Sequence, residues 1–178
     1  MTLLNLPFTE IGGIPFAATI LLLGVAAFTD LRAMIIPNWI TLPFFISGLF
    51  YHGVFAGWDG LVRALAGVAA GFGPLLLLHL ARGIGAGDVK LFGALGAWIG
   101  VVPVLYIMLY AILYAGVIGA LWLILHRPFF KRMAAGAGAL VGRRSGARQG
   151  EWAAWAAGGR TFPFMLAVVP GAVTFFIQ

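Results

Sequence analysis

The sequence lacks cysteine and has few charged residues. None of its 178 residues is cysteine, which excludes a disulfide framework and a metal site built from thiolates. Its three histidines, His52, His79 and His126, share no ligand spacing, so we expect neither a metal nor another cofactor. Charged residues make up 9% of the chain and hydrophobic residues 62%, which is too little polar surface for a water-soluble domain. The composition therefore predicts an integral membrane protein.

Basic residues outnumber acidic ones, with eleven Lys and Arg against five Asp and Glu and a formal net charge of +6. A positive charge can indicate nucleic-acid binding. In a membrane protein, however, basic cytoplasmic loops that face anionic lipid are the commoner cause. We therefore expect anionic lipids, and not nucleic acid, as partners of these side chains.

Long apolar stretches predict an all-α fold, a polytopic membrane bundle of six transmembrane helices. A helix crosses the hydrocarbon core with about 20 apolar residues. As one helix, residues 91–125 would be roughly 50 Å long, so we predict two spans there with a turn near residues 100–103. Residues 1–10 contain no Lys or Arg, so we predict that the first apolar stretch is a retained span and not a cleaved signal peptide. The chain is predicted to form a single domain, residues 1–178, with spans at 11–29, 36–55, 61–80, 89–102, 104–125 and 162–177.

The distribution of basic residues predicts that the N-terminus lies outside. With six spans in that orientation only Arg63 falls outside, as the positive-inside rule favours. The loop 127–160 then lies in the cytoplasm, either as a linker on anionic headgroups, which we favour, or as a segment that grips a substrate. The ten cytoplasmic basic residues are Arg32, Arg82, Lys90, Arg127, Lys131, Arg132, Arg143, Arg144, Arg148 and Arg160.

Two of the five acidic residues lie at predicted membrane boundaries. Asp30 ends the first predicted span and Asp88 begins the fourth, whereas Glu10, Asp59 and Glu151 lie in predicted loops. Acids at membrane depth are costly and are functional candidates by default. Because two complete spans separate Asp30 from Asp88, both return to the same face and can approach one another. The alternative is two unrelated helix-end residues, which a helix N-terminus would explain for Asp88 but not for Asp30.

Two carboxylates in one site suit peptide hydrolysis. Both cannot ionise cheaply at once, so one keeps its proton while the other stays charged. The ionised carboxylate takes a proton from water, and the protonated one polarises the scissile carbonyl and then assists the leaving amine. Because such a pair titrates as a unit, sequence alone does not assign the two roles. The sequence predicts that Asp30 and Asp88 are the catalytic pair.

Two glycines precede the second acid, in the pattern Gly85-Ala86-Gly87-Asp88. Glycines at these positions remove side-chain bulk and permit unusual φ and ψ angles, so that a substrate segment could approach the backbone. In a chain with 26 glycines the pattern alone is weak, and a plain loop into a helix is the alternative.

Polar residues near both acids are further candidates for shaping the site or binding substrate. Pro37 suits the start of the second helix. Asn38 either caps that helix, which we favour, or is directed at the site. Lys90, like Arg32, lies two residues from an aspartate. Anchoring to headgroups is the favoured role of both bases, and tuning the acid pair or orienting substrate is the alternative.

The sequences around Asp30 and Asp88 resemble those of the type IV prepilin peptidases, the Gly-x-Gly-Asp class of membrane aspartyl proteases. Residues 30–38 look like the family's Asp-(six residues)-Pro segment, and residues 85–96 look like its second signature. The resemblance implies that Asp30 and Asp88 are catalytic and that Gly85 and Gly87 shape the site. It also implies that the protein lies in the bacterial inner membrane. There it would remove the basic leader of prepilins or pseudopilins at the cytoplasmic face, before the substrate's hydrophobic helix.

The chain is most similar to a short subfamily. Longer family members carry an N-terminal region with paired Cys-x-x-Cys motifs and also N-methylate the new terminus. Here about ten residues precede the first span and cysteine is absent, as in the CpaA/TadV-like peptidases of Flp/Tad pili, so we expect no methyltransferase activity. Archaeal preflagellin peptidases are also similar. Presenilin-like proteases share Gly-x-Gly-Asp, but their Pro-Ala-Leu motif is not found near this C-terminus.

Two other classes of function remain open. Intramembrane carboxylates also carry protons or coupling ions, so a proton- or ion-coupled transporter is the main alternative, although such acids usually lie near the midplane. The other alternative is a non-catalytic component of pilus or secretion assembly, for which both aspartates would be dispensable.

Overall fold

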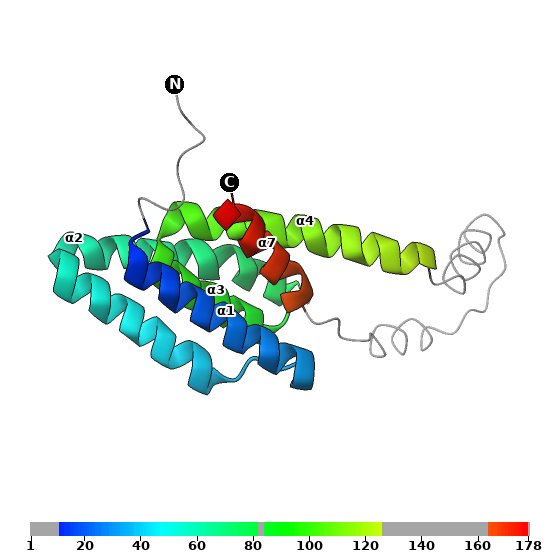
Figure 1. The fold of residues 1–178 in the computed structure, drawn as a ribbon, viewed down its shortest axis with the longest axis horizontal. Coiled ribbons are helices and arrows are strands. Elements are labelled where there is room, and N and C mark those ends of the chain that lie inside the picture. The colour runs from blue at the N-terminus through cyan, green and yellow to red at the C-terminus, as the bar shows by residue number, and fades with distance from the viewer. Residues whose placement is uncertain (1–10, 82–83, 126–163, 178) are drawn as a thin grey trace, which may run out of the picture. The chain divides into compact units, whose positions relative to one another are not determined.

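The computed structural model describes residues 11–81, 84–125 and 164–177, and the regular structure in them is all α-helical (Figure 1). The predicted all-α fold is therefore confirmed, whereas the predicted basic loop 127–160 lies outside the described residues. The chain divides into two compact units, residues 1–115 with 163–178, and residues 116–162. The candidate site described below lies in the first unit. The helices are α1 (Gly13–Ala33), α2 (Asn38–Leu80), α3 (Ala86–Ile99), α4 (Val101–Leu125) and α7 (Met165–Ile177).

Helix α2 is a hairpin whose two halves run in opposite directions (Figure 1). The reversal depends on Gly57, with φ 62° and ψ −151°, a combination that is essentially restricted to glycine. The predicted spans 36–55 and 61–80 fall one in each half. The prediction that Asp59 lies in a loop between these spans was wrong, because Gly57 alone reverses the chain and Asp59 lies in the helix that follows.

Helix α3 is the central helix of this unit and packs chiefly against α2. Every residue from Leu91 to Ile99 is buried. Helix α3 ends where predicted, near residue 100, because Gly100 adopts φ 77° before α4 begins. At this end Trp98 binds α2 twice, since its Nε1 donates to the Phe44 carbonyl at 2.8 Å and its own carbonyl pairs with His52 Nε2 at 3.0 Å.

Glycines bring the backbones of α2 and α3 into contact. A Cβ atom on Gly67 would collide with the carbonyl oxygen of Gly96, and one on Gly96 would collide with that of Gly67. One turn further along α2, a Cβ on Gly71 would collide with the Phe92 carbonyl. Small residues at such crossings are the usual means by which membrane helices approach closely, because dispersion contacts replace the hydrophobic effect within lipid.

Helix α7 lies antiparallel to α1. At one end the rings of Phe16 and Phe176 meet edge to face with centroids 5.0 Å apart. At the other end the Met165 amide bonds to Asp30. Helix α7 also contacts the first part of α4, where the hydroxyls of Tyr114 and Thr174 are 2.8 Å apart. The C-terminal helix is thus held against α1 at both of its ends.

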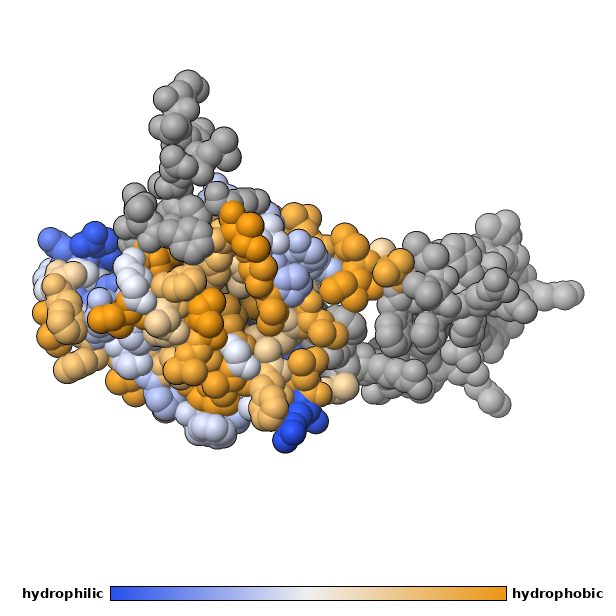
Figure 2. Space-filling view, viewed as in Figure 1, coloured by the Kyte–Doolittle hydropathy of each residue, from blue (hydrophilic) through white to orange (hydrophobic). Residues whose placement is uncertain are grey.

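The surface is that of a multi-pass membrane protein. Large apolar side chains are exposed along α1, α2, α4 and α7, and orange hydrophobic atoms cover much of the visible face in Figure 2. Within the described residues α1, α2 and Val101–Leu121 are long and apolar enough to cross a membrane, and α7 is a shorter apolar helix. The count of six spans and the outward N-terminus remain predictions.

Candidate active site

The two aspartates line one cavity of about 240 Å³. The predicted approach of Asp30 and Asp88 is thus confirmed, although their catalytic role remains a prediction. The remaining lining comes from the two segments that the sequence had singled out, the end of α1 with the link into α2, and the start of α3. These lining residues are Met34, Ile35, Ile36, Gly85, Ala86 and Gly87.

Asp30 lies in the last turn of α1 and not beyond it, because the helix continues to Ala33. The helix ends when Met34 adopts a left-handed conformation, φ 52°, and donates its N–H to the Asp30 carbonyl at 2.8 Å. The Asp30 side chain is 6% exposed, and its Oδ2 accepts a hydrogen bond from the Met165 N–H at 3.1 Å. Sequence reasoning missed this third contributor to the site.

Asp88 lies in the first turn of α3, directly before the predicted span 89–102, and is 9% exposed. Burial, followed by the nearby charge of Asp30, raises the pKa of Asp88 to about 6, although a hydrogen bond with the Gly85 backbone acts in the opposite direction. Like charges in a shared desolvated site oppose double ionisation. The pair therefore holds one proton more readily than two separate carboxyl groups would.

Gly85 and Gly87 do not use the unusual backbone angles that glycine permits, whereas the lack of side-chain bulk matters at both positions. Gly85 has φ −70° and ψ 147°, and Gly87 lies within α3 and has no positive φ. Their importance is steric. A Cβ on Gly87 would lie 3.1 Å from the Ile36 Cβ, and one on Gly85 would lie 3.2 Å from the Asp88 Oδ2. The missing side chains let the segment 34–36 approach α3 and leave space beside the Asp88 carboxyl group.

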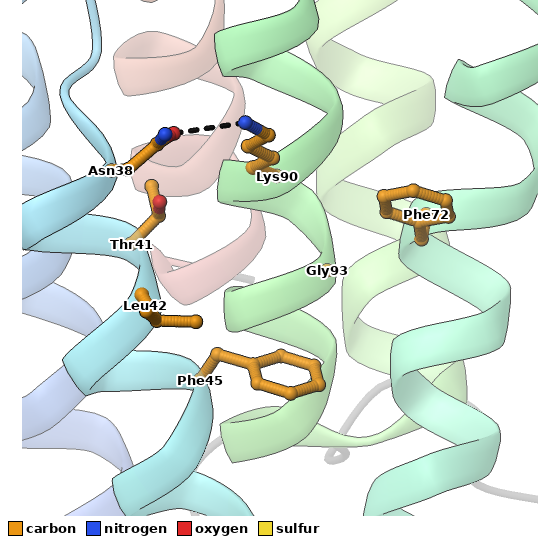
Figure 3. A pocket seen from close by; sticks show the side chains of 7 residues that line it. All are labelled: Asn38, Thr41, Leu42, Phe45, Phe72, Lys90 and Gly93. Atoms are coloured by element: carbon orange, nitrogen blue, oxygen red, sulfur yellow. Dashed lines mark hydrogen bonds between the residues drawn. The ribbon is translucent and has the colours of Figure 1, made fainter.

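Asn38 and Lys90 lie outside the cavity of the aspartates. They line a separate groove of about 270 Å³, whose walls are α3 and both halves of α2 (Figure 3). Pro37 immediately precedes α2, as predicted, but the favoured capping role of Asn38 was wrong, because α2 has no side-chain cap. Instead the Asn38 Oδ1 accepts a hydrogen bond from Lys90 Nζ at 2.9 Å. A role for either residue in substrate binding would act through this groove, which Thr41, Leu42, Phe45, Phe72 and Gly93 complete.

The other base near the site, Arg32, is directed away from the carboxylates. Its guanidinium carbon lies 4.4 Å from the centroid of the Phe28 ring, a cation–π contact on the same helix. Arg32 does not line the cavity. The described residues around the cavity therefore supply two carboxylates and backbone amides, and no group of three or more potential metal ligands occurs among them.

His79 closes the turn that leads to Asp88. Its Nδ1 lies 2.7 Å from the Ile84 carbonyl, so Nδ1 carries the proton and donates. This bond joins the end of α2 to the residue directly before Gly85. It limits the freedom of the segment that carries the second carboxylate.

We expect His79→Ala to lower the rate of peptide cleavage about 5-fold, because one hydrogen bond is worth about 1 kcal/mol. His79→Asn should retain most activity, since the Asn amide nitrogen occupies nearly the place of Nδ1. His79→Gln, whose nitrogen corresponds to Nε2, serves as the matched control and should behave like alanine. Equal cleavage rates for all three purified variants would exclude this role.

The profile of the type IV leader peptidase family matches residues 17–124, more than half of the chain, and the chain belongs to that family. The matched region includes both aspartates and excludes α7.

Comparison with individual proteins gives the same family. The prepilin leader peptidase/N-methyltransferase of Xanthomonas campestris is 37% identical over 105 residues, which cover 53% of this chain and 35% of the relative. The protein of the same name from Bacillus subtilis is 34% identical over 133 residues, covering 68% of this chain and 52% of the relative. Leader peptidase HopD of Salmonella typhimurium is 37% identical over 90 residues, covering 47% and 56%. These matches thus span from about a third to somewhat over half of each relative's length. No solved structure matches the chain.

Proposed function

We propose that this chain is a membrane aspartyl endopeptidase that removes the basic leader from type IV prepilins or pseudopilins. The observation that carries the proposal is the pair of buried carboxylates, Asp30 and Asp88, in one cavity of a chain from the leader peptidase family. Both acids lie at helix ends, in the last turn of α1 and the first turn of α3. That placement favours a peptidase over a transporter, whose coupling acids usually lie near the midplane.

In the proposed reaction one carboxylate removes a proton from water while the water oxygen bonds to the scissile carbonyl carbon. The other carboxyl group donates its proton to the carbonyl oxygen, giving a tetrahedral diol. The C–N bond then breaks as the first carboxyl group returns its proton to the leaving nitrogen. The second carboxylate takes a proton from the diol as the new acid forms. One water is consumed, and the pair ends with the single proton with which it began.

The proposed place of cleavage is the cytoplasmic face of the bacterial inner membrane, with anionic lipid around the basic side chains. This follows from the predicted outward N-terminus and the positive-inside distribution. The proposed substrates are Flp/Tad-type prepilins, because the chain resembles the short CpaA/TadV-like subfamily. Because the resemblance is to that short subfamily, we expect cleavage without N-methylation.

The test is co-expression of the chain with a Flp-type prepilin, followed by mass spectrometry of the pilin. We expect a loss equal to the leader and no added methyl group. A conventional type IV prepilin expressed in parallel should be cleaved less, if the subfamily assignment holds. An unprocessed Flp precursor beside a well-inserted chain would contradict the proposed function.

EDTA should leave this cleavage unchanged, because the proposed reaction uses two carboxylates and water. Cleavage by purified protein in detergent would be followed with and without the chelator, and then with excess Mg²⁺ restored. Inhibition by EDTA that Mg²⁺ reverses would contradict the two-carboxylate mechanism while leaving the peptidase activity itself established.

A further inference from the structure

The first residue of α7 supplies a backbone donor to the candidate site. The first N–H groups of any helix have no partner within the helix. At the start of α7, the amides of Ala167 and Val168 donate to the Phe164 carbonyl at 2.9 and 3.2 Å. The Met165 amide is instead directed at Asp30 Oδ2, at 3.1 Å, in a buried environment.

This donor offsets the unfavourable electrostatic environment of Asp30 at the C-terminal end of α1. The last turn of α1 presents the partial negative charge of its free carbonyls, which disfavours a carboxylate. The N-terminus of α7 presents the opposite partial charge, and a hydrogen bond to a charged acceptor is stronger than one between neutral groups. Helix α7 thus provides the positive partial charge and the N–H donor that stabilise a carboxylate, which the end of α1 lacks.

The start of α7 is held in place and is not a loose terminus. The Met165 side chain is 1% exposed. Further along, a Cβ on Gly171 would lie only 2.9 Å from the Ala111 nitrogen of α4, so the two helices are in close contact. With Phe176 against Phe16 at the far end, the position of the Met165 amide is determined by packing along the whole helix.

We propose that the Met165 amide is a positioning group of the active site, and that it holds Asp30 as the ionised base while Asp88 carries the shared proton. This inference rests on the proposed function and assigns the two roles that the sequence left open. Among residues 11–81, 84–125 and 164–177, Asp88 of α3 is the ionisable group that interacts with Asp30. The lining segment 34–36 is uncharged, Arg32 lies on Phe28, and Lys90 bonds Asn38 in the groove.

One feature of Asp88 opposes this assignment and is outweighed. Asp88 lies in the first turn of α3, where the helix dipole and the Gly85 backbone favour its charged form. Burial and the charge of Asp30 nevertheless leave the pKa of Asp88 raised. The assignment of the proton to Asp88 thus rests first on the Met165 N–H, which is bonded to Asp30 Oδ2, and is supported by the raised pKa of Asp88.

The test removes a single N–H. Met165→Pro deletes this amide at the first position of a helix, where proline is well tolerated. Met165→Ala truncates the side chain equally but keeps the N–H, so it is the matched control. Cleavage of a prepilin peptide would be measured across pH with the full chain in detergent. The proline variant should cleave about 10- to 100-fold more slowly at neutral pH. The acidic limb of its pH–rate profile should move up by about one unit. The alanine variant should keep the wild-type limb.

Identical acidic limbs for the proline and alanine variants would overturn the inference while leaving the peptidase intact. No cleavage by wild-type protein would instead contradict the proposed function. If Met165→Pro fails to fold, Met165→Leu would be compared with the α-hydroxy acid analogue of leucine (2-hydroxy-4-methylpentanoic acid) at the same position, which replaces the N–H by an ester oxygen and keeps the side chain. The same shift of the acidic limb is expected for the ester, and its absence would again overturn the proposal.

Discussion

Replacing Asp88 by asparagine is expected to lower the rate of leader cleavage by about 10²- to 10⁴-fold, the usual contribution of a general acid or base. Asparagine keeps the size of the side chain but cannot hold or release the transferred proton. Because the substitution replaces a buried carboxyl group, whose ionisation burial and Asp30 oppose, by a neutral amide, the unfolding temperature in detergent should equal or exceed that of the wild type. Purified variants would be compared by single-turnover cleavage and by thermal unfolding.

Asp30→Asn should lose activity to a similar degree, and the double variant should be little worse than either single variant, because the two residues act as a unit. Asp59→Asn is the matched control. Asp59 is an exposed acid in α2 that lies outside the cavity, so its replacement should leave the rate unchanged. A fully active Asp88→Asn protein would end the two-carboxylate hypothesis. A wild-type protein that inserts well but does not cleave would favour the alternative function, ion transport.

Gly67→Ala is expected to destabilise the fold severely, although it adds only one methyl group. The new Cβ would collide with the Gly96 carbonyl, a backbone atom that cannot turn aside, so α2 and α3 must separate. Extra methylene groups in a packed core typically cost about 1–3 kcal/mol, and a backbone clash at a helix crossing belongs at or above the upper end. We expect a marked fall in the unfolding temperature in detergent and in the yield of inserted protein.

Gly73→Ala is the matched control for this substitution. It adds the same methyl group to the same half of α2, but no atom lies within 4 Å of the new Cβ. Because alanine favours helix by about 1 kcal/mol over glycine, this variant should be neutral or slightly more stable. Equal unfolding temperatures for Gly67→Ala and Gly73→Ala would show that the close crossing of α2 and α3 does not govern stability.

The helices and the meeting of the two acids could be predicted because each depends on local composition or on parity. The lengths of the apolar runs predicted the positions of the helices, and the even number of predicted crossings indicated that Asp30 and Asp88 could meet, as they do in one cavity. The boundaries were less accurate. Helix α1 continues through Leu31, Arg32 and Ala33, since these are good helix formers even where the apolar run has ended.

Other features carried no signal in the sequence. A backbone amide has no residue type of its own, so nothing in the letters indicated that Met165 would bond Asp30. Likewise, a chain with 26 glycines does not reveal that Gly57 makes a turn while Gly67 makes a helix contact. Asn38 was misread because residue type favours a cap, whereas the distant Lys90 provides the bond that it makes.

The hydrogen bond between Asp30 and Met165 joins residues 135 positions apart. The ribosome must therefore translate almost the entire described chain before this contact can form. A nascent chain that already contains both aspartates still lacks the amide that we assign to holding Asp30 ionised. The full rate of the proposed cleavage would then be reached only once the last described helix has docked, and a half-made chain would cleave neighbouring membrane proteins more slowly during synthesis.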